Sequence, residues 1–291
     1  MNRSLTAVPG VLAGHATDLV GRTGVTVVVF PEGARAGCFV PGSATGSREL
    51  GVLEPGHLAG AVHGFCLAGG SAFGLAAADG VMRVLEERGI GFHTPEAVVP
   101  ILPAAILYDL HTATRRPDAA MGEVAARLAD HRPLGEGSVG AATGARVGMA
   151  SGAPDRGGFG SWADLPDDQD GYVVAVGVAV NAVGSVVDPT NGRRVAGGEP
   201  LRRSAGFWRG QTTLAVVVTD APLDRDGCTV VARMASAGLA RALVPAFTPF
   251  DGDLVLVAST GEGDPVDANQ MLEVGDRAAS CLSTAIVRAV R

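Results

Sequence analysis

The pattern of apolar and polar positions along the chain predicts a series of strands and helices. Short apolar runs rich in β-branched residues are typical of strands. They occur at residues 24–31, 172–180, 185–188, 211–220 and 254–260, and another ends at Leu67. Apolar residues recur at helical spacing in residues 72–88, 119–131, 225–242 and 266–289. The mixture of both patterns along the whole length predicts an α/β protein.

The predicted helix at residues 72–88 follows a glycine turn, Gly69-Gly70-Ser71. Ser71 is a good N-cap, and Gly89 lies where a C-terminal glycine is expected. A glycine turn before a helix is also a place where phosphate groups bind. This turn has neither the Lys-Ser/Thr pair of a P-loop nor the spacing of a dinucleotide fingerprint. Nucleotide binding therefore stays a secondary interpretation.

Ser71 also lies on a strand-to-helix turn, the place where α/β-type serine hydrolases carry their nucleophile. Asp109 and His111 would complete a triad in that interpretation. The usual motif has glycine two residues after the serine, whereas this chain has Phe73 there. The serine-hydrolase interpretation is kept as an alternative.

Three segments lack a regular pattern. Residues 97–110 are apolar but contain Pro100 and Pro103, so they cannot be a central strand throughout, and we expect a buried irregular segment or an edge. Residues 135–171 are rich in glycine, and we expect loops around a cleft there. Residues 192–210 form a polar linker rich in glycine and arginine.

Composition is even over the 291 residues, which suggests one domain, residues 1–291, or two closely packed halves. Apolar residues make up 47% of the chain and aromatic residues 4%, so we expect a core built mainly of valine, alanine and leucine. The formal net charge of −7 offers no positive field for a phosphate backbone, which argues against a nucleic-acid partner. The chain has no lysine, and this excludes Schiff-base and lysine-base mechanisms.

The four cysteines stand singly along the chain, which is typical of a protein from a reducing compartment. The first residues lack an apolar signal core, and no apolar run reaches about 18 residues. We therefore expect a cytoplasmic protein without a membrane partner. No group of histidine, cysteine and carboxylate residues has metal-ligand spacing, so we expect neither a metal nor another cofactor.

Candidate chemistry gathers at the start of two predicted strands. The run 211–220 opens with two hydroxyl side chains, Thr212 and Thr213, and Asp251-Gly252-Asp253 stands directly before the next run. Side chains two residues apart on extended backbone point to the same side, so the two carboxylates can converge on one spot. In the simpler interpretation, the threonines only begin an edge strand and the acids lie in a solvated turn.

Asn181 follows directly after the apolar run that ends at Val180. A buried amide without partners costs about 1–3 kcal/mol, so a buried asparagine at this place needs a use. From the residues alone, the simplest interpretation is a turn-forming asparagine.

Several further motifs stand along the chain in a definite order. They are Val8-Pro9-Gly10-Val11 with Gly14-His15, Phe30-Pro31-Glu32-Gly33-Ala34-Arg35, Gly69-Gly70-Ser71-Ala72-Phe73-Gly74-Leu75 with Ala78-Asp79-Gly80, Gly140-Ala141-Ala142-Thr143-Gly144, Val180-Asn181-Ala182-Val183-Gly184 and Val187-Asp188-Pro189. Together with the Thr212 and Asp251 segments, they resemble the self-cleaving aminopeptidases and amidases of the L-aminopeptidase/D-esterase family. The relatives of that family include β-aminopeptidases and a nylon-oligomer hydrolase.

The resemblance implies an α-β-β-α sandwich, in which two packed sheets are flanked by helices. It also implies that the chain cleaves itself between Gln211 and Thr212 into residues 1–211 and 212–291. Thr212 then becomes an N-terminal nucleophile. Its freed α-amine has an ordinary pKa of about 8 and can accept the hydroxyl proton near neutral pH.

Three other catalytic residues are carried over from the resemblance. Asn181 would donate its side-chain NH₂ to the developing oxyanion or to the nucleophile. Asp251 and Asp253 would hold the ammonium form and the hydroxyl of Thr212 in place, and one of the two would anchor the free amine of the substrate. The implied substrate is a small peptide or amide with a free amine, and the implied assembly is a homo-oligomer, a tetramer in the resembling family.

Two positions depart from the family pattern. Gln211 stands before the cut where relatives have Gly or Asn, residues that tolerate positive φ. Met149 stands where relatives of the nylon-hydrolase type have lysine. Two other functions stay open: an uncleaved, non-catalytic homologue that binds an amine or peptide, and a self-cleaving acyltransferase.

Overall fold

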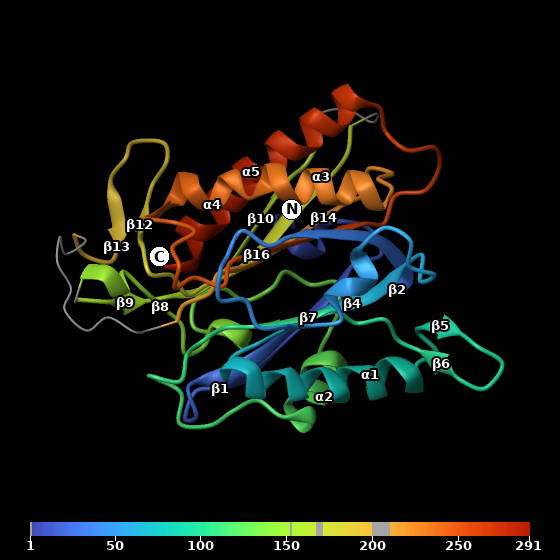
Figure 1. The fold of residues 1–291 in the computed structure, drawn as a ribbon, viewed down its shortest axis with the longest axis horizontal. Helices are drawn as coiled ribbons and strands as arrows, with labels where there is room; N and C mark the ends of the chain where they lie inside the picture. Colours follow the sequence, from blue (N-terminus) through green and yellow to red (C-terminus); the bar gives the residue numbers. More distant parts are fainter. Residues whose placement is uncertain (1, 152, 167–170, 200–209) are drawn as a thin grey trace.

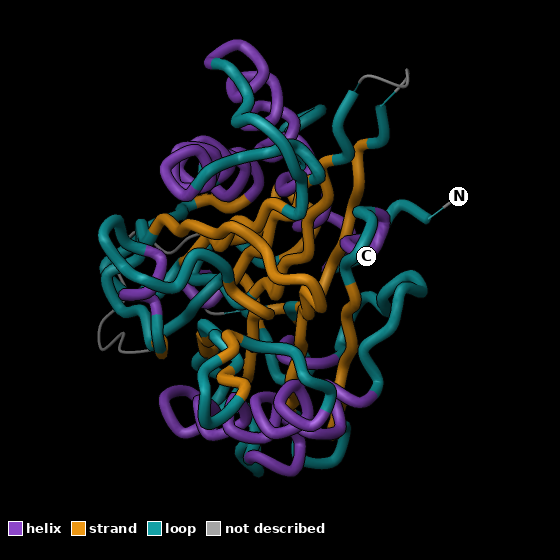
Figure 2. The backbone as a smooth tube through the Cα atoms, turned by 90° about the vertical axis from the view of Figure 1, so that its right-hand side faces the viewer, coloured by secondary structure: helices purple, strands orange, loops and turns teal. Residues whose placement is uncertain are grey.

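The computed structural model describes residues 2–151, 153–166, 171–199 and 210–291. Two stacked sheets lie between two layers of helices (Figures 1 and 2). In Figure 1, α3, α4 and α5 cover one side of the strands, and α1 and α2 cover the other. The α-β-β-α sandwich expected from the sequence is confirmed.

The first sheet is built from strands of the N-terminal part of the chain. Its order is β1-β2-β4-β7-β3, with β1 at Leu12–Asp18, β2 at Thr23–Phe39, β4 at Val62–Ala68, β7 at Ala104–Ile106 and β3 at Ser47–Arg48. Its outer face is covered by α1 (Ala77–Glu87) and α2 (Ala119–Arg127).

The second sheet has the order β10-β11-β14-β16-β2. Its strands are β10 (Gly158–Asp164), β11 (Val174–Val180), β14 (Leu214–Thr219), β16 (Leu254–Ser259) and the last part of β2. α3 (Arg225–Ala235), α4 (Ala237–Ala242) and α5 (Ala268–Ala289) cover its outer face. Strands β14 and β16 are parallel neighbours, so they begin at the same end of the sheet.

Strand β2 belongs to both sheets. Up to Val29 it pairs with β1 and β4, and from Arg35 onward it pairs with β16. The register with β4 shifts between Val29 and Ala34, and Gly33 has a φ of +79°, which glycine adopts readily. The long strand therefore bends at this point and links the two sheets.

Alternation along the central strands fills two separate layers of the core. Leu214, Val216 and Val218 of β14 pack between the two sheets, whereas Ala215 and Val217 pack toward the helices on the other face. This is the period-2 pattern of a strand buried on both sides. The apolar run around Val216 is continuous because neither face of the strand meets water.

The remaining regular elements are short. They are the strands β5 (Phe92–His93), β6 (Val98–Val99), β8 (Arg146–Val147), β9 (Asp155–Arg156), β12 (Ser185–Val187), β13 (Arg194–Ala196) and β15 (Leu243–Val244), and single 3₁₀ turns at Leu5–Ala7, Leu50–Leu53, Ser71–Ala76, Gly140–Ala142 and Met149–Ser151. Within the described ranges, no helix has the length and apolar character needed to cross a membrane.

Some local predictions are wrong. Ser71 is not an N-cap: it begins a 3₁₀ turn with a φ of +56°, and the α-helix starts only at Ala77. Residues 135–171 contain the seven-residue strand β10 as well as loops. Residues 97–110 are mostly irregular, as expected, but β7 within them pairs with β4 on one side and β3 on the other, so it is not an edge strand.

Candidate active site

The parallel pairing of β14 and β16 brings the two candidate segments together. Gln211 and Asp251 form a β-bridge directly before the two strands. The N–H of Thr213 donates to Oδ1 of Asp253 at 2.8 Å. Thr212, Asp251 and Asp253 are each 1% exposed, so the solvated-turn interpretation of the acids is wrong. β14 also lies between β11 and β16, so the threonines do not begin an edge strand.

The peptide bond between Gln211 and Thr212 has two hydrogen-bond donors on its carbonyl oxygen. Oγ1 of Thr212 donates to it at 2.6 Å, and the N–H of Gly252 donates to it at 2.8 Å. Both donors increase the positive charge on the carbonyl carbon. The hydroxyl that would attack this carbon therefore lies beside it, and a backbone donor is already in place for the oxygen.

Glycine is required at position 252 because there is no room for a side chain. A Cβ at this position would lie 2.7 Å from Oγ1 of Thr212 and 2.6 Å from the carbonyl oxygen of Ala44. Both distances are below normal contact. Residue 252 therefore has to be glycine for its N–H to reach the Gln211 carbonyl. The sequence showed the two acids on either side of it but gave no sign of this backbone donor.

Asn181, at the end of β11, connects three segments of chain. Its backbone carbonyl accepts the N–H of Thr212 at 2.7 Å. Its side-chain Nδ2 donates to the carbonyl of Tyr108 at 3.0 Å, and its Oδ1 accepts the N–H of Arg146 at 2.9 Å. The amide is fully buried and bonded at both ends. Its contact to Thr212 thus runs through the backbone carbonyl, and the side chain positions its neighbours.

Asp251 holds two turns together. Its Oδ1 accepts the N–H of Val183 at 3.2 Å, and its Oδ2 accepts the N–H and the Oγ1 of Thr248 at 3.0 and 2.5 Å. Burial raises the pKa of its carboxyl group, although the hydrogen bonds from Thr248 and Val183 oppose the shift. Met149 is buried in a 3₁₀ turn. The next residue of this turn, Ala150, donates its backbone N–H to the carbonyl of Val183.

Asp253 is the more strongly perturbed carboxyl group. Burial is the largest cause, and the neighbouring charge of Asp251 is the second; together they raise its pKa to about 7. Two buried carboxyl groups this close cannot both ionise easily. The pair therefore favours a positive charge beside it, such as an ammonium group.

A cavity of about 250 Å³ opens against the Gln211–Thr212 bond. Its wall is mainly apolar and includes Ala44, Ala72, Ile106, Tyr108, Pro249 and Phe250. The Gln211 side chain borders this cavity and is fully buried, and neither Oε1 nor Nε2 has a hydrogen-bond partner among the described residues. The wall residues come from distant segments, so the sequence pattern did not reveal them.

Ser71 borders the same cavity, but its surroundings do not form a triad. Asp109 accepts the N–H of Gly70 at 2.7 Å and Oγ1 of Thr23 at 3.2 Å. Its carboxylate is thus engaged with the glycine turn, and burial raises its pKa to about 6. Because this carboxylate takes the N–H of Gly70, the turn does not offer that group to a phosphate either.

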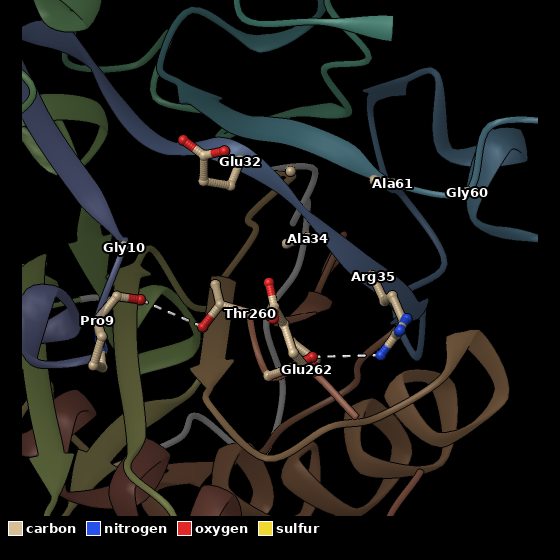
Figure 3. Close-up of a pocket in the computed structure, with 12 residues that line it drawn as sticks. Pro9, Gly10, Glu32, Ala34, Arg35, Gly60, Ala61, Thr260 and Glu262 are labelled. Carbon is tan, nitrogen blue, oxygen red and sulfur yellow. Dashed lines mark hydrogen bonds between the residues drawn. The ribbon is translucent and has the colours of Figure 1, made fainter. Parts of the chain in front are cut away.

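A larger hollow, of about 450 Å³, lies at the opposite end of β16 (Figure 3). Arg35 donates to the carbonyl of Gly261, and Thr260 donates to the carbonyl of Pro9. Glu32 and Glu262 also border it. The hydroxyls at this end, those of Ser259 and Thr260, donate to carbonyls of residues elsewhere in the chain. The Thr212 hydroxyl instead donates to the carbonyl of the residue directly before it, so the chemistry is expected at the Thr212 end of the strand.

The comparison with known families agrees with the motifs. The sequence profile of peptidase family S58 matches residues 3–291. The chain belongs to peptidase family S58. It is therefore a hydrolase, as the family resemblance implied.

Two relatives illustrate the range of the family. A protein named as an uncharacterized aminopeptidase from Mycobacterium leprae (strain TN) is 36% identical over an alignment 333 residues long. The alignment covers 99% of this chain and 90% of the relative. A 6-aminohexanoate-oligomer endohydrolase from Kocuria sp. (strain KY2) is 30% identical over 277 residues, or 88% of this chain and 74% of that enzyme.

Solved structures agree on the fold. A β-aminopeptidase from Burkholderia sp. superposes with a TM-score of 0.79 at 25% identity, over 99% of this chain and 86% of that one. The L-aminopeptidase D-Ala-esterase/amidase of Ochrobactrum anthropi is described as a variant of the Ntn-hydrolase fold. It superposes with a TM-score of 0.78 at 18% identity, over 99% of this chain and 85% of that one. The sandwich described above is thus of the Ntn-hydrolase type.

Proposed function

We propose that the chain is an N-terminal-nucleophile amidohydrolase or aminopeptidase that cleaves itself between Gln211 and Thr212. It then hydrolyses a small peptide or amide with a free amine through an acyl intermediate on Thr212. One observation carries this proposal most directly: the buried Gln211 carbonyl accepts hydrogen bonds from both the Thr212 hydroxyl and the Gly252 N–H.

The self-cleavage begins when Oγ1 of Thr212 attacks the carbonyl carbon of Gln211. The carbonyl oxygen becomes an oxyanion, and the Gly252 N–H stabilises it. The C–N bond then breaks, the hydroxyl proton passes to the departing nitrogen, and an ester joins Gln211 to Thr212. Water hydrolyses this ester, which leaves a carboxylate on Gln211 and a free hydroxyl and α-amine on Thr212.

The environment of Gln211 favours this step. Its φ is not in the left-handed region, so the strain that Gly or Asn can store before the cut is absent here. Its buried amide instead has no hydrogen-bond partner among the described residues, and an unpaired amide costs about 1–3 kcal/mol. Cleavage releases Gln211 as a chain end that can leave the pocket. The destabilisation that promotes the acyl shift thus lies in the side chain.

After cleavage, the new α-amine serves as the base. The Thr212 nitrogen already lies 2.7 Å from the carbonyl oxygen of Asn181, which keeps the amine in place. With an ordinary pKa of about 8, the amine can accept the hydroxyl proton near neutral pH. The nearby pair Asp251 and Asp253 stabilises the ammonium form and supplies a carboxylate for the free amine of the substrate.

The acyl part of the substrate occupies the cavity beside Thr212. Its volume of about 250 Å³ and mainly apolar wall suit one amino-acyl group of modest size. Departure of Gln211 would enlarge the cavity toward the nucleophile. A small amine or peptide then leaves as the acyl group transfers to Thr212, and water completes the hydrolysis.

A substrate panel tests the reaction. Purified protein is mixed with amino-acid p-nitroanilides and amides, with and without an added amine acceptor, and products are separated by mass spectrometry. We expect free amino acid as the main product and none with Thr212→Ala. If acyl transfer to the added amine is faster than hydrolysis by water, the protein is an acyltransferase. Binding without turnover would identify a non-catalytic homologue.

A further inference from the structure

A hollow separate from the catalytic cavity is lined by three arginines. It measures about 480 Å³ and shares no lining residue with the cavity beside Thr212. Arg22, Arg146 and Arg156 border it, together with the hydroxyl residues Thr112, Ser138 and Thr143. Among the described residues that line it, none is Asp or Glu. We call it the arginine pocket.

The three guanidinium groups are unpaired within the described ranges of the chain. Elsewhere, arginines such as Arg127, Arg277 and Arg288 form ion pairs with Glu87, Asp164 and Glu136. Acidic residues outnumber basic ones, 30 to 23, so partners for arginine are plentiful. Three guanidinium groups at one hollow without a carboxylate form a local positive field in an acidic protein.

The backbone places two of these charges opposite each other. Arg146 on β8 and Arg156 on β9 are direct partners in the antiparallel register of the hairpin. Like charges at facing positions of a strand pair repel each other. An anion between the two guanidinium groups would turn this repulsion into two attractive contacts.

Arg22 is held in the pocket by a strained backbone. Its φ is +53°, in the left-handed region that residues other than glycine rarely adopt. Its carbonyl lies so close to Gly144 that a Cβ there would approach it to 2.3 Å. The backbone of Arg22 therefore packs against the pocket wall, while the residue as a whole is exposed. Such backbone outliers are found at functional sites.

Asp18, directly before the lining residue Leu19, accepts the N–H of Gly21 and pairs with Arg115. Two further carboxylates near the pocket are also engaged elsewhere. Asp109 lies behind Gly144, where it accepts the bonds from Gly70 and Thr23 described above. Asp155 precedes Arg156 on β9, so its side chain points to the other face of the hairpin, and it accepts the N–H of Gly197 at 2.7 Å. Neither neutralises the arginines by an ion pair.

We propose that the arginine pocket binds a small anion that carries at least two phosphate or carboxylate groups. Arginine pairs with either group through two parallel hydrogen bonds. The volume lies within the range of small-molecule sites and exceeds the needs of one monovalent ion. The pocket also adjoins the catalytic framework, because the N–H of Arg146 is the donor to Asn181.

Isothermal titration calorimetry of the purified protein tests this assignment. Pyrophosphate and citrate are titrated separately at a constant ionic strength set with potassium chloride. We expect saturable binding of one anion per 291-residue chain. The anion that binds with the higher affinity shows whether the pocket prefers phosphate or carboxylate groups. No saturable heat with either probe would overturn the proposal.

Variants connect the binding to the pocket. Arg146→Gln and Arg156→Gln should each weaken binding by about tenfold or more, as loss of a charge-assisted pair does. Arg88→Gln, on an exposed arginine that does not line the pocket, is the matched control and should bind like the wild type. Thermal melts without anion show that each variant is folded. Equal affinity in all three folded variants would place the anion elsewhere and contradict the proposal.

Discussion

The N–H of Gly252 donates to the carbonyl oxygen of Gln211 at 2.8 Å, in the peptide bond directly before Thr212. The turn that carries the two acids therefore also carries a donor for the oxyanion of self-cleavage. This relationship arises because β14 and β16 are parallel neighbours that begin at the same end of the sheet. It joins residues about 40 positions apart into one site.

Replacing Gly252 by alanine should disrupt this donor. The new Cβ would meet Oγ1 of Thr212 and the carbonyl of Ala44, so the turn has to move away from Gln211. We expect self-cleavage to slow by roughly a hundredfold or more, the scale of losing one oxyanion donor. Gly60→Ala, which has no atom within 4 Å of the new Cβ, is the control. A time course of fragment formation on denaturing gels measures both, and equal rates in the two variants would remove the role of Gly252.

Asn181→Ala should lower stability as well as activity. The substitution leaves the buried N–H of Arg146 and the carbonyl of Tyr108 without their side-chain partner. We expect a loss of about 1–3 kcal/mol in the free energy of unfolding. Asn191→Ala, in an exposed turn, should change it by less than about 0.5 kcal/mol. Urea unfolding measures the difference, and an equally small effect at both positions would show that Asn181 is only a turn residue.

The two acids should respond differently to loss of charge. Asp253→Asn should lose most of the turnover and keep the fold, because the amide oxygen can still accept the Thr213 N–H. Asp251→Asn should retain more turnover and lose more stability, since one carboxylate oxygen that accepts from Val183 or Thr248 becomes a donor. Values of kcat/KM on the amide panel, beside thermal melts, separate the effects. Near-normal hydrolysis by Asp253→Asn would exclude it from the site.

The raised pKa of Asp253 predicts a specific pH dependence. The carboxyl group ionises near its ordinary value of 3.8 in the unfolded chain but near 7 in the folded one. Ionisation therefore favours unfolding, so this contribution to stability is complete below pH 3.8 and is lost as pH rises toward 7. The Asp253→Asn substitution removes this pH-dependent contribution to stability.

The comparison is best made in the Thr212→Ala background, where both proteins are single chains. The melting temperature of the Asp253→Asn variant, relative to its parent, should rise from about pH 4 to about pH 7. Both proteins share every other titrating group, so the difference reports the Asp253 carboxyl group together with its coupling to Asp251. A difference that does not vary with pH would mean that Asp253 ionises normally.

The sequence predicted the site unevenly, and the reasons are physical. Thr212 and Asp253 could be found because each stands at the start of an apolar run and matches a family motif. The Gly252 N–H and the Tyr108 carbonyl could not, because backbone groups leave no mark in a sequence and their partners are far away along the chain. The resemblance predicts a role for the NH₂ of Asn181, whereas the hydrogen bond between Asn181 and Thr212 in the structure is made by the backbone carbonyl of Asn181.

Strand β10 was missed for a packing reason. Its glycines, Gly158 and Gly160, resemble a loop in composition, but α5 lies directly on them. A Cβ at either position would lie 2.0 Å from the carbonyl oxygen of Ala289 or Ala285. Glycine is therefore needed for the close approach of helix and strand. Only the tertiary contact distinguishes this use of glycine from a turn.

An intact-mass spectrum of the purified protein tests self-cleavage most directly. After incubation near neutral pH, wild type should give two masses, those of residues 1–211 and 212–291, and N-terminal sequencing of the smaller should begin at Thr212. Thr213→Ala should still be cut, whereas Thr212→Ala should remain one chain. A wild-type protein that keeps the single mass of all 291 residues after days of incubation would contradict the assignment of Thr212 as the nucleophile.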